Sequence, residues 1–412
     1  MSGGYQVALV VQKYGGTSVA TAERVRHVAG RVVATRRAGH AVVVVVSAPG
    51  DMTDELIARA REISPRPPAR ELDMLMAVGE QISIALLSMA IQELGQEAIS
   101  LTGSQVRILT DGVHTKARIL EVDRRRLDAE LARGRVVVVA GFQGVTPDHE
   151  ITTLGRGGSD VTAVALASAL GAEVCEIFTD VEGVFSADPR VVPEARKLDV
   201  VSYDEMLEMA SSGAVVLQTR SVEYAKHYRV RLHVRSTWSE EPGTIVEEVP
   251  TMERVRLVTG VTHDLDVARI TIRDLPDIPG IAHRIFSALA ARHINVDMIV
   301  QTASRGGRAD ISFTVTKADA APAEEVTREV AREIGAAEVA ASQDVAKVSI
   351  VGAGMASNPG VAATMFGALA GEGINIQMIS TSEIKVSCVV SAGDVHRAVR
   401  AVHRAFSLDA VR

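Results

Sequence analysis

Apolar and amphipathic stretches alternate along about the first 240 residues. Runs such as "AVVVVV" (41–46) and "RVVVVA" (135–140) have no polar alternation, which is typical of strands buried on both faces. The stretches at 21–39 and 71–95 instead repeat their apolar residues with a helical period. Because the two patterns alternate, the sequence predicts an α/β fold, a mainly parallel sheet sandwiched by helices. Ligands of such sheets bind at the carboxyl ends of the strands.

The pattern changes at "SEEPGTIVEEVPTMER" (239–254), which is rich in charge and proline, and we place a domain boundary near Glu247. Beyond it, residues 270–299 and 350–379 align at an offset of 80, with 12 identities in 30 positions. Each copy is predicted to contain a strand, a Pro-Gly turn, a helix, an Ile-Asn strand, and a further strand and helix, as in a ferredoxin-like module. The predicted domains are therefore 1–247 and 248–412, with modules at about 265–340 and 345–412 that pack as a pair.

Composition narrows the function classes. The formal net charge of -7 argues against a nucleic-acid or anionic-membrane surface, and the purely apolar runs are shorter than a membrane span. The N-terminus lacks the basic region of a signal peptide. The two cysteines, Cys175 and Cys388, lie far apart and form no disulfide framework or metal spacing. We expect a cytoplasmic protein.

The stretch "QKYGGTSVA" (12–20) leads from a predicted strand to a predicted helix. Lys13 stands just before Gly15 and Gly16, and Thr17-Ser18 can cap the helix. A bare glycine backbone at a helix N-terminus suits a phosphate group, and lysine adds a positive charge. The alternative is a capped turn with an incidental lysine. The chain contains neither a P-loop nor a G-x-G-x-x-G motif.

The stretch "TTLGRGGSD" (152–160) sets Arg156 among three glycines and ends on Asp160 at the start of a helical pattern. One interpretation is a tight turn, since Gly-Gly marks turns generally. The other is a site for an anionic ligand that also carries a cation.

Three weaker candidates follow other predicted elements. Ser47 and Thr53 follow a buried strand, Glu80 interrupts an apolar helix, and Thr179-Asp180 ends another strand before "VEGVFSADPR". Helix capping, a solvated face and a surface hairpin are the respective alternatives. None of these motifs contains a histidine, which indicates chemistry that needs no general base at neutral pH.

Taken in order, "KYGGTSV", "GEQIS", "TTLGRGGSD" and "TDVEGVFSADPR", followed by the repeat, resemble aspartate kinase over essentially the whole chain. The resemblance implies an amino-acid-kinase fold followed by two ACT domains. It implies the reaction of ATP with L-aspartate to give 4-phospho-L-aspartate and ADP, the first step toward lysine, threonine and methionine. The nucleophile is then a carboxylate with an ordinary pKa of about 3.9, already ionised at neutral pH.

The resemblance also implies residue roles. Lys13 would bridge the transferring phosphoryl oxygens, Arg156 would clamp the substrate α-carboxylate, and Asp160 and Glu80 would hold the α-ammonium. Ser47 and Thr53 would position the reacting carboxylate, beside Gly157, Gly158 and Ser159. The cofactor would be Mg-ATP, with the metal carried by the nucleotide. The residues that would line it are Lys13, Tyr14, Gly15, Gly16, Thr179, Asp180, Phe185, Ser186, Ala187, Asp188, Pro189 and Arg190.

The ACT modules would bind amino-acid effectors, lysine or threonine or both, at their shared interface. They would also make a homo-oligomer, and a shorter regulatory subunit could start at Met252. The implied effector residues are Asp277, Gly280, Ile281, Ala282, Asn295, Asn375, Ile376 and Ser382.

Two positions depart from the family pattern. Pro49 replaces a non-proline residue, and Val215 stands where the family usually has a lysine that reaches the nucleotide. Arg190 and Arg220 are the cations that could compensate. The alternatives left open are another acyl-phosphate-forming amino-acid kinase and a catalytically weakened amino-acid sensor.

Overall fold

The computed structural model describes residues 8–249, 257–355 and 358–410. They form two compact units, which we describe separately. The first unit comprises residues up to 184, 197–207 and 215–250, and the second comprises 185–196, 208–214 and 251 onward. Met252, the predicted internal start, lies outside the described residues.

The first unit is built on an eight-stranded sheet in which six neighbouring strands, from β11 to β3, run parallel. Only the β11–β12 pair is antiparallel, so the predicted mainly parallel sheet is confirmed. The stretch expected to break the pattern contains β12. In sheet order the strands are β10 (Val200–Ser202), β12 (Thr244–Glu247), β11 (Leu232–Ser236), β9 (Val174–Thr179), β1 (Leu9–Tyr14), β2 (Ala41–Val46), β6 (Val136–Ala140) and β3 (Ala98–Leu101).

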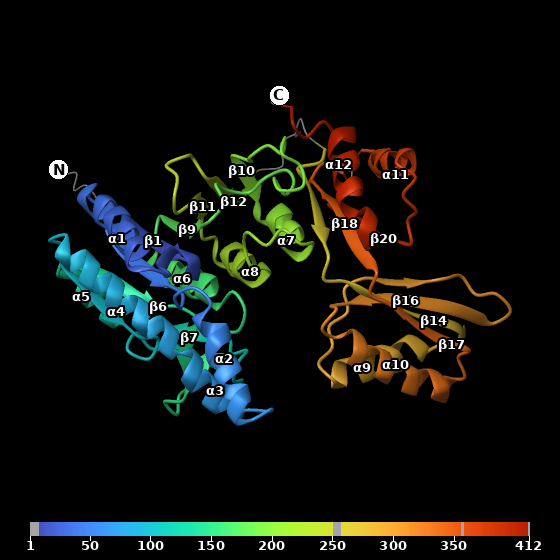
Figure 1. Ribbon diagram of the computed structural model, residues 1–412, viewed down its shortest axis with the longest axis horizontal. Coiled ribbons are helices and arrows are strands. Elements are labelled where there is room, and N and C mark those ends of the chain that lie inside the picture. The colour runs from blue at the N-terminus through green and yellow to red at the C-terminus, as the bar shows by residue number, and fades with distance from the viewer. Residues whose placement is uncertain (1–7, 250–256, 356–357, 411–412) are drawn as a thin grey trace. The chain divides into compact units, whose positions relative to one another are not determined.

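Helices cover both faces of this sheet because its central strands are apolar on both sides. Alternate residues of β2, at 42, 44 and 46, pack with α1 (Ala22–Arg37) and α4 (Val78–Glu93), which lie side by side (Figure 1). On the other face, α6 (Gly158–Leu170) packs against β1, β2 and β9 and is almost wholly buried. The remaining helices of this unit are α2 (Met52–Ile63), α3 (Ala69–Met76), α5 (Arg125–Ala132), α7 (Tyr203–Ser211, which continues into the second unit) and α8 (Thr219–Tyr228).

The helical stretch Ala69–Glu93, which contains α3 and α4, is long and apolar enough to cross a membrane by composition alone. Half of its most apolar window is buried inside the protein, as in a core helix. It is weak evidence for a membrane span.

A second, smaller sheet of the first unit has the order β5-β4-β7-β8. Helix α3 packs on its edge strand β8. The strands are β4 (Ile108–Thr110), β5 (Ile119–Val122), β7 (Gln143–Val145) and β8 (Ile151–Thr153).

The second unit contains two four-stranded antiparallel sheets, as the internal repeat predicts. The first, in the order β15-β16-β14-β17, has α9 and α10 on one face and the complete ferredoxin-like βαββαβ sequence (Figure 1). Its elements are β14 (Ala268–Pro276), α9 (Ile281–Ala291), β15 (Ile299–Gln301), β16 (Arg308–Val315), α10 (Ala320–Ile334) and β17 (Glu338–Ser342).

The second sheet, β13-β18-β20-β19, is completed by a strand that precedes the first module in the sequence. Strand β13 pairs with β18 where a final C-terminal strand was expected, so the first module is inserted into the second. The predicted Ile-Asn strands are wrong, because Ile294-Asn295 and Ile374-Asn375 precede β15 and β19. The elements are β13 (Gly260–Asp264), β18 (Val345–Val351), α11 (Val361–Gly371), β19 (Met378–Thr381), β20 (Lys385–Ser391) and α12 (Val395–Ala405).

The predicted Pro-Gly turns are present in both modules. Gly280 and Gly360 precede α9 and α11 with φ angles of 95° and 98°, a left-handed conformation that favours glycine. The helices therefore begin 80 residues apart, as the repeat indicates.

The segment 185–196 packs into the second unit's core. Ala187, Val191 and Val192 belong to the same apolar cluster as residues of β18, α11 and α12. The chain therefore leaves the first unit at residue 185, returns at 197, and repeats the excursion at 208–214 before the linker.

Candidate active site

The carboxyl end of β1 and the N-terminus of α6 meet at an ion pair. The Lys13 ammonium lies 2.6 Å from Asp160 Oδ1, and both side chains are largely buried. A Cβ at Gly15 would lie 3.7 Å from the same ammonium nitrogen. The structure thus brings together the lysine and the glycine turn of one stretch of sequence and the acid of another.

The end of β2 adds hydroxyl groups to this site. The loops after β1 and β2 are joined by backbone bonds, in which Ser47 N–H donates to Tyr14 O and Gly50 N–H to Gly16 O. Ser47 Oγ donates to Ser159 Oγ at 2.9 Å. The first turn of α6 is thereby tied to the end of β2.

Glu80, in the first turn of α4, is 2% exposed. Its Oε1 accepts a hydrogen bond from Ala48 N–H at 3.0 Å, whereas Oε2 has no hydrogen-bond partner in the described part of the structure. Burial raises the pKa of this carboxyl to about 7. A buried acid with one unpaired oxygen is costly for the fold, and a cationic ligand would pair with it.

Arg156 is exposed, and its guanidinium makes no hydrogen bond or ion pair with any described residue. The turn that carries it contains Gly157, with φ 72°, where a Cβ would also clash with Gln218. Arg220 donates to Leu154 O at 2.7 Å and to Ala117 O at 2.8 Å. Arg220 therefore supports the turn and is not a spare cation for the nucleotide.

The predicted nucleotide-lining set divides between the two units. Thr179 is the last residue of β9 in the first unit, and its Oγ1 donates to Asp180 Oδ1 at 3.0 Å. The segment 185–190 belongs to the second unit, where Asp188 and Arg190 form an exposed ion pair. Ser186 and Ala187 are buried, so their side chains are not available to a nucleotide.

Two further expectations from the N-terminal motif are corrected. The Tyr14 side chain is fully buried and stacks on Phe178 with ring centroids 4.6 Å apart, so only its backbone is available to a ligand. Helix α1 is capped by Thr21, which accepts from Arg24 N–H, rather than by Thr17-Ser18. Ser18 Oγ instead contacts Thr237 Oγ1 at 2.8 Å.

Other reactive groups do not converge here. Burial raises the pKa of the Cys175 thiol and that of Cys388, the latter to about 12, so neither is poised as a nucleophile. Among the described residues, no cluster of three His, Cys, Asp or Glu side chains could hold a metal ion. The site offers charge complementarity to a ligand that carries charges of both signs.

Comparison with known proteins identifies this arrangement. A model of the amino acid kinase family matches residues 8–236, and models of the ACT domain match residues 269–335 and 348–406. The aspartokinase of Mycolicibacterium smegmatis is 53% identical over 409 residues, which cover 98% of this chain and 97% of that protein. The chain belongs to the aspartokinase family.

Solved aspartokinases share the fold. Aspartokinase III of E. coli in complex with aspartate and ADP is 26% identical and has a TM-score of 0.81, covering 96% of this chain and 99% of its own. The same enzyme in complex with lysine and aspartate has a TM-score of 0.75 at the same identity and the same coverage.

As an aspartokinase, the chain is an ATP-dependent enzyme that phosphorylates the side-chain carboxylate of L-aspartate to give 4-phospho-L-aspartate. Its ACT modules make it an allosteric enzyme of lysine, threonine and methionine biosynthesis. The alternatives left open by the sequence, another amino-acid kinase or a weakened sensor, are thereby set aside.

Sequence reasoning missed one acid beside this aspartokinase site. Asp73 on α3 is fully buried and contacts the strand that leads to Arg156. It lies in the amphipathic stretch "RELDMLM", where an aspartate reads as a surface residue, and its partners come from distant segments. No local signal in the sequence marks it.

Proposed function

We propose that the group of residues around Lys13 binds and phosphorylates L-aspartate, with each charge of the substrate met by one side chain. The observation that carries the proposal is the unpaired Oε2 of buried Glu80, which suits the α-ammonium. The guanidinium of Arg156, which is exposed and has no partner among the described residues, suits the α-carboxylate, since its planar fork binds a carboxylate through two bonds. Ser47 and Thr53 position the reacting carboxylate.

The phosphoryl transfer then depends on alignment and charge neutralisation. The substrate carboxylate is already ionised, so no side chain has to remove a proton. Lys13 neutralises charge on the transferring phosphoryl group. Asp160, which the resemblance assigned to the α-ammonium, lies 2.6 Å from the Lys13 ammonium and orients it.

The nucleotide enters as Mg-ATP, with the metal ion as part of the substrate. Gly15, Gly16, Thr179 and Asp180 line it from the first unit. The complex of E. coli aspartokinase III with aspartate and ADP supports a shared site for amino acid and nucleotide in this fold.

Feedback control would act through the paired modules. β15 and β19 are edge strands of the two sheets and lie side by side. Arg269 donates to Gln377 Oε1 at 2.7 Å, and Lys347 pairs with Asp297. The expected effector residues cluster near these edges, and exposed Asp277, Asn295, Asn375 and Ser382 leave polar groups for an amino acid. The lysine complex of E. coli aspartokinase III supports lysine as an effector, and threonine is the second candidate.

Assembly and location complete the proposal. The ACT modules would form a homo-oligomer, with a shorter regulatory subunit from an internal start at Met252, in the cytoplasm. Neither nucleic acid nor membrane is a partner.

The test of the substrate site is Arg156→Lys, which keeps the charge and loses the fork. We expect the KM for aspartate to rise by about tenfold or more, with the KM for ATP changed far less. Arg125→Lys is the matched control, because Arg125 is exposed on α5 and, among the described residues, pairs only with Asp123. An unchanged aspartate KM in Arg156→Lys would remove this residue from the substrate site.

A further inference from the structure

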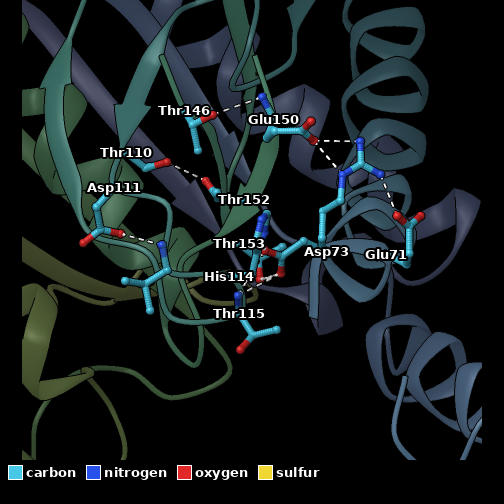
Figure 2. Close-up of polar contacts among 12 residues, drawn as sticks. Glu71, Asp73, Thr110, Asp111, His114, Thr115, Thr146, Glu150, Thr152 and Thr153 are labelled. Atoms are coloured by element: carbon cyan, nitrogen blue, oxygen red, sulfur yellow. Dashed lines mark hydrogen bonds and ion pairs between the residues drawn. The ribbon is translucent and has the colours of Figure 1, made fainter. Parts of the chain in front are cut away.

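Asp73 is a buried carboxylate that takes no direct part in the reaction. Its Oδ1 accepts a hydrogen bond from Thr153 Oγ1 at 2.5 Å, and its Oδ2 accepts one from His114 Nδ1 at 2.8 Å. Both oxygens also accept from the Thr115 N–H, at 3.1 and 3.0 Å (Figure 2). A buried carboxylate whose two oxygens are both hydrogen-bonded is held rigidly. If one donor were lost, the buried charge would be left uncompensated, at a large desolvation cost.

The bonds from Asp73 hold a strained piece of backbone. Thr115 has a φ of 66°, and a β-branched residue in the left-handed region is a conformational outlier. Such strain persists only where surrounding contacts impose it, and it clusters at functional sites. Here the contact that imposes the strain is the hydrogen bond from the Thr115 N–H to the Asp73 carboxylate.

The strained loop in turn supports the turn that carries Arg156. Ala117 N–H donates to Thr153 O at 2.9 Å, and a Cβ at Gly155 would lie only 3.0 Å from Thr115 O. The chain runs three residues from Thr153, whose hydroxyl Asp73 holds, to Arg156. The Asp73 carboxylate therefore holds the backbone that leads from β8 to Arg156 through two contacts, one with the Thr153 hydroxyl and one with the Thr115 N–H.

The same carboxylate is linked to Glu80. Asp73 lies on α3, which ends at Met76, and α4 begins two residues later with Glu80 in its first turn. The junction is held by Gln143 Nε2, which donates to Ala77 O at 3.0 Å. We propose that Asp73 is a positioning residue of the aspartate site, one that sets the distance between Arg156 and Glu80. This rests on the proposed roles of those two residues as the carboxylate and ammonium contacts.

A second tie between α3 and the same strand offers a contrast. Arg70 pairs with Glu150, just before β8, but their side chains are 44% and 40% exposed (Figure 2). Exposed pairs of this kind contribute little to stability. Breaking the Arg70–Glu150 pair leaves the hydrogen bonds of Asp73 intact, so Arg70→Ala is the matched control.

The experiment measures the KM for aspartate, the KM for ATP and the melting temperature of four variants. Asp73→Asn keeps the shape and removes the charge, and Thr153→Val removes only the hydroxyl donor. We expect both to raise the aspartate KM, Asp73→Asn by roughly 10- to 100-fold, while the ATP KM stays within about twofold. Thr153→Ser, which restores the hydroxyl, should return the aspartate KM toward that of the unsubstituted protein, and Arg70→Ala should leave it there.

Two results would overturn the proposal. One is an unchanged aspartate KM in Thr153→Val, which decides the matter even if Asp73→Asn does not fold. The other is an equal rise of both KM values with a lower melting temperature, which would make Asp73 a purely structural residue. Arg156→Lys separates this failure from that of the substrate site: if it raises the aspartate KM and the Asp73 and Thr153 variants do not, only the positioning role is wrong.

Discussion

The Lys13 ammonium and the Asp160 carboxylate form a 2.6 Å ion pair across the junction of β1 and α6. Each side chain was expected to meet a different charge of the substrates, and the structure shows them meeting each other. Because the Asp160 carboxylate holds the lysine in place, the ammonium needs little reorganisation when charge develops on the phosphoryl group.

This ion pair can be tested with a double-mutant cycle. Lys13→Ala should lower kcat by about 10²–10³-fold, as the loss of one transition-state donor does elsewhere. Asp160→Asn should lower kcat less, and the double variant should be little worse than Lys13→Ala, because the two residues act as one unit. Steady-state kcat values of the three variants measure this. A rise in aspartate KM with unchanged kcat in Asp160→Asn would instead assign the acid to the α-ammonium.

Glu80 predicts a pH dependence of aspartate binding. Its pKa is raised to about 7, so the ionised form that would bind the ammonium is lost as the pH falls below 7. The kcat/KM for aspartate should rise through this range with increasing pH, whereas the KM for ATP should not follow it. Glu80→Gln should lower kcat/KM and remove this limb of the profile. A limb that persists in Glu80→Gln belongs to another group.

The same carboxyl affects the stability of the ligand-free protein with a defined sign. The folded pKa of about 7 lies above the ordinary 4.5, so the folded state holds the proton more tightly. The stabilisation is fully present below about pH 4.5 and is lost as the pH rises through 7. Between pH 5 and pH 8 the melting temperature of the protein should therefore fall by more than that of the Glu80→Gln variant. Added aspartate should reduce this difference between the two proteins.

Val215 and Arg220 are expected to affect the binding of different substrates. Val215 is 76% exposed, so Val215→Lys can be accommodated and should lower the KM for ATP, by up to roughly tenfold if the new cation meets phosphate. Arg220 is bonded to the backbone beneath Arg156, so Arg220→Ala should raise the KM for aspartate rather than that for ATP. An ATP effect in Arg220→Ala would restore it as the compensating cation. No change in Val215→Lys would show that position 215 does not face the nucleotide.

The regulatory unit contains a testable buried contact. Ser186 Oγ accepts from Arg196 N–H at 2.9 Å and forms a hydrogen bond of 3.0 Å with His403 Nε2. Burial lowers the pKa of His403 below its ordinary 6.5, so its contribution is present above that pH and is lost as the pH falls through the lowered value. His403→Leu should destabilise the unit by about 1–3 kcal/mol at pH 8, with a smaller penalty at pH 5. Chemical unfolding at both pH values measures this, and an equal penalty at both would contradict the assignment.

Some of this site could be predicted from sequence and some could not. The turns after β1 and before α6 can be recognised in the sequence as candidate binding sites. In each of them glycines stand close to a basic residue, Lys13 or Arg156, at the end of a strand. Asp73 has no such signal, since its burial depends on donors 41 to 80 residues away. The burial of Ser186 has no local signal either: its motif follows other predicted nucleotide-lining residues in sequence, while its side chain packs with α12.

The fold, like the site, could be predicted from the sequence only in part. Periodicity and the 80-residue repeat predict the sheet types and both modules, because these depend on local patterns. They do not show that β13 completes the second module, since strand pairing across an inserted domain leaves no trace in the pattern of either strand.

The segment 185–196 bears on how regulation can be exchanged between relatives. Ala187, Val191 and Val192 are core residues of the regulatory unit, yet they are encoded within the catalytic half of the gene. A chimera that joins residues 1–250 of this chain to the ACT region of another aspartokinase would therefore place three native side chains in a foreign core, where close packing tolerates few changes of shape. Feedback specificity would be transferred more readily by substitutions within the unit than by recombination at the linker.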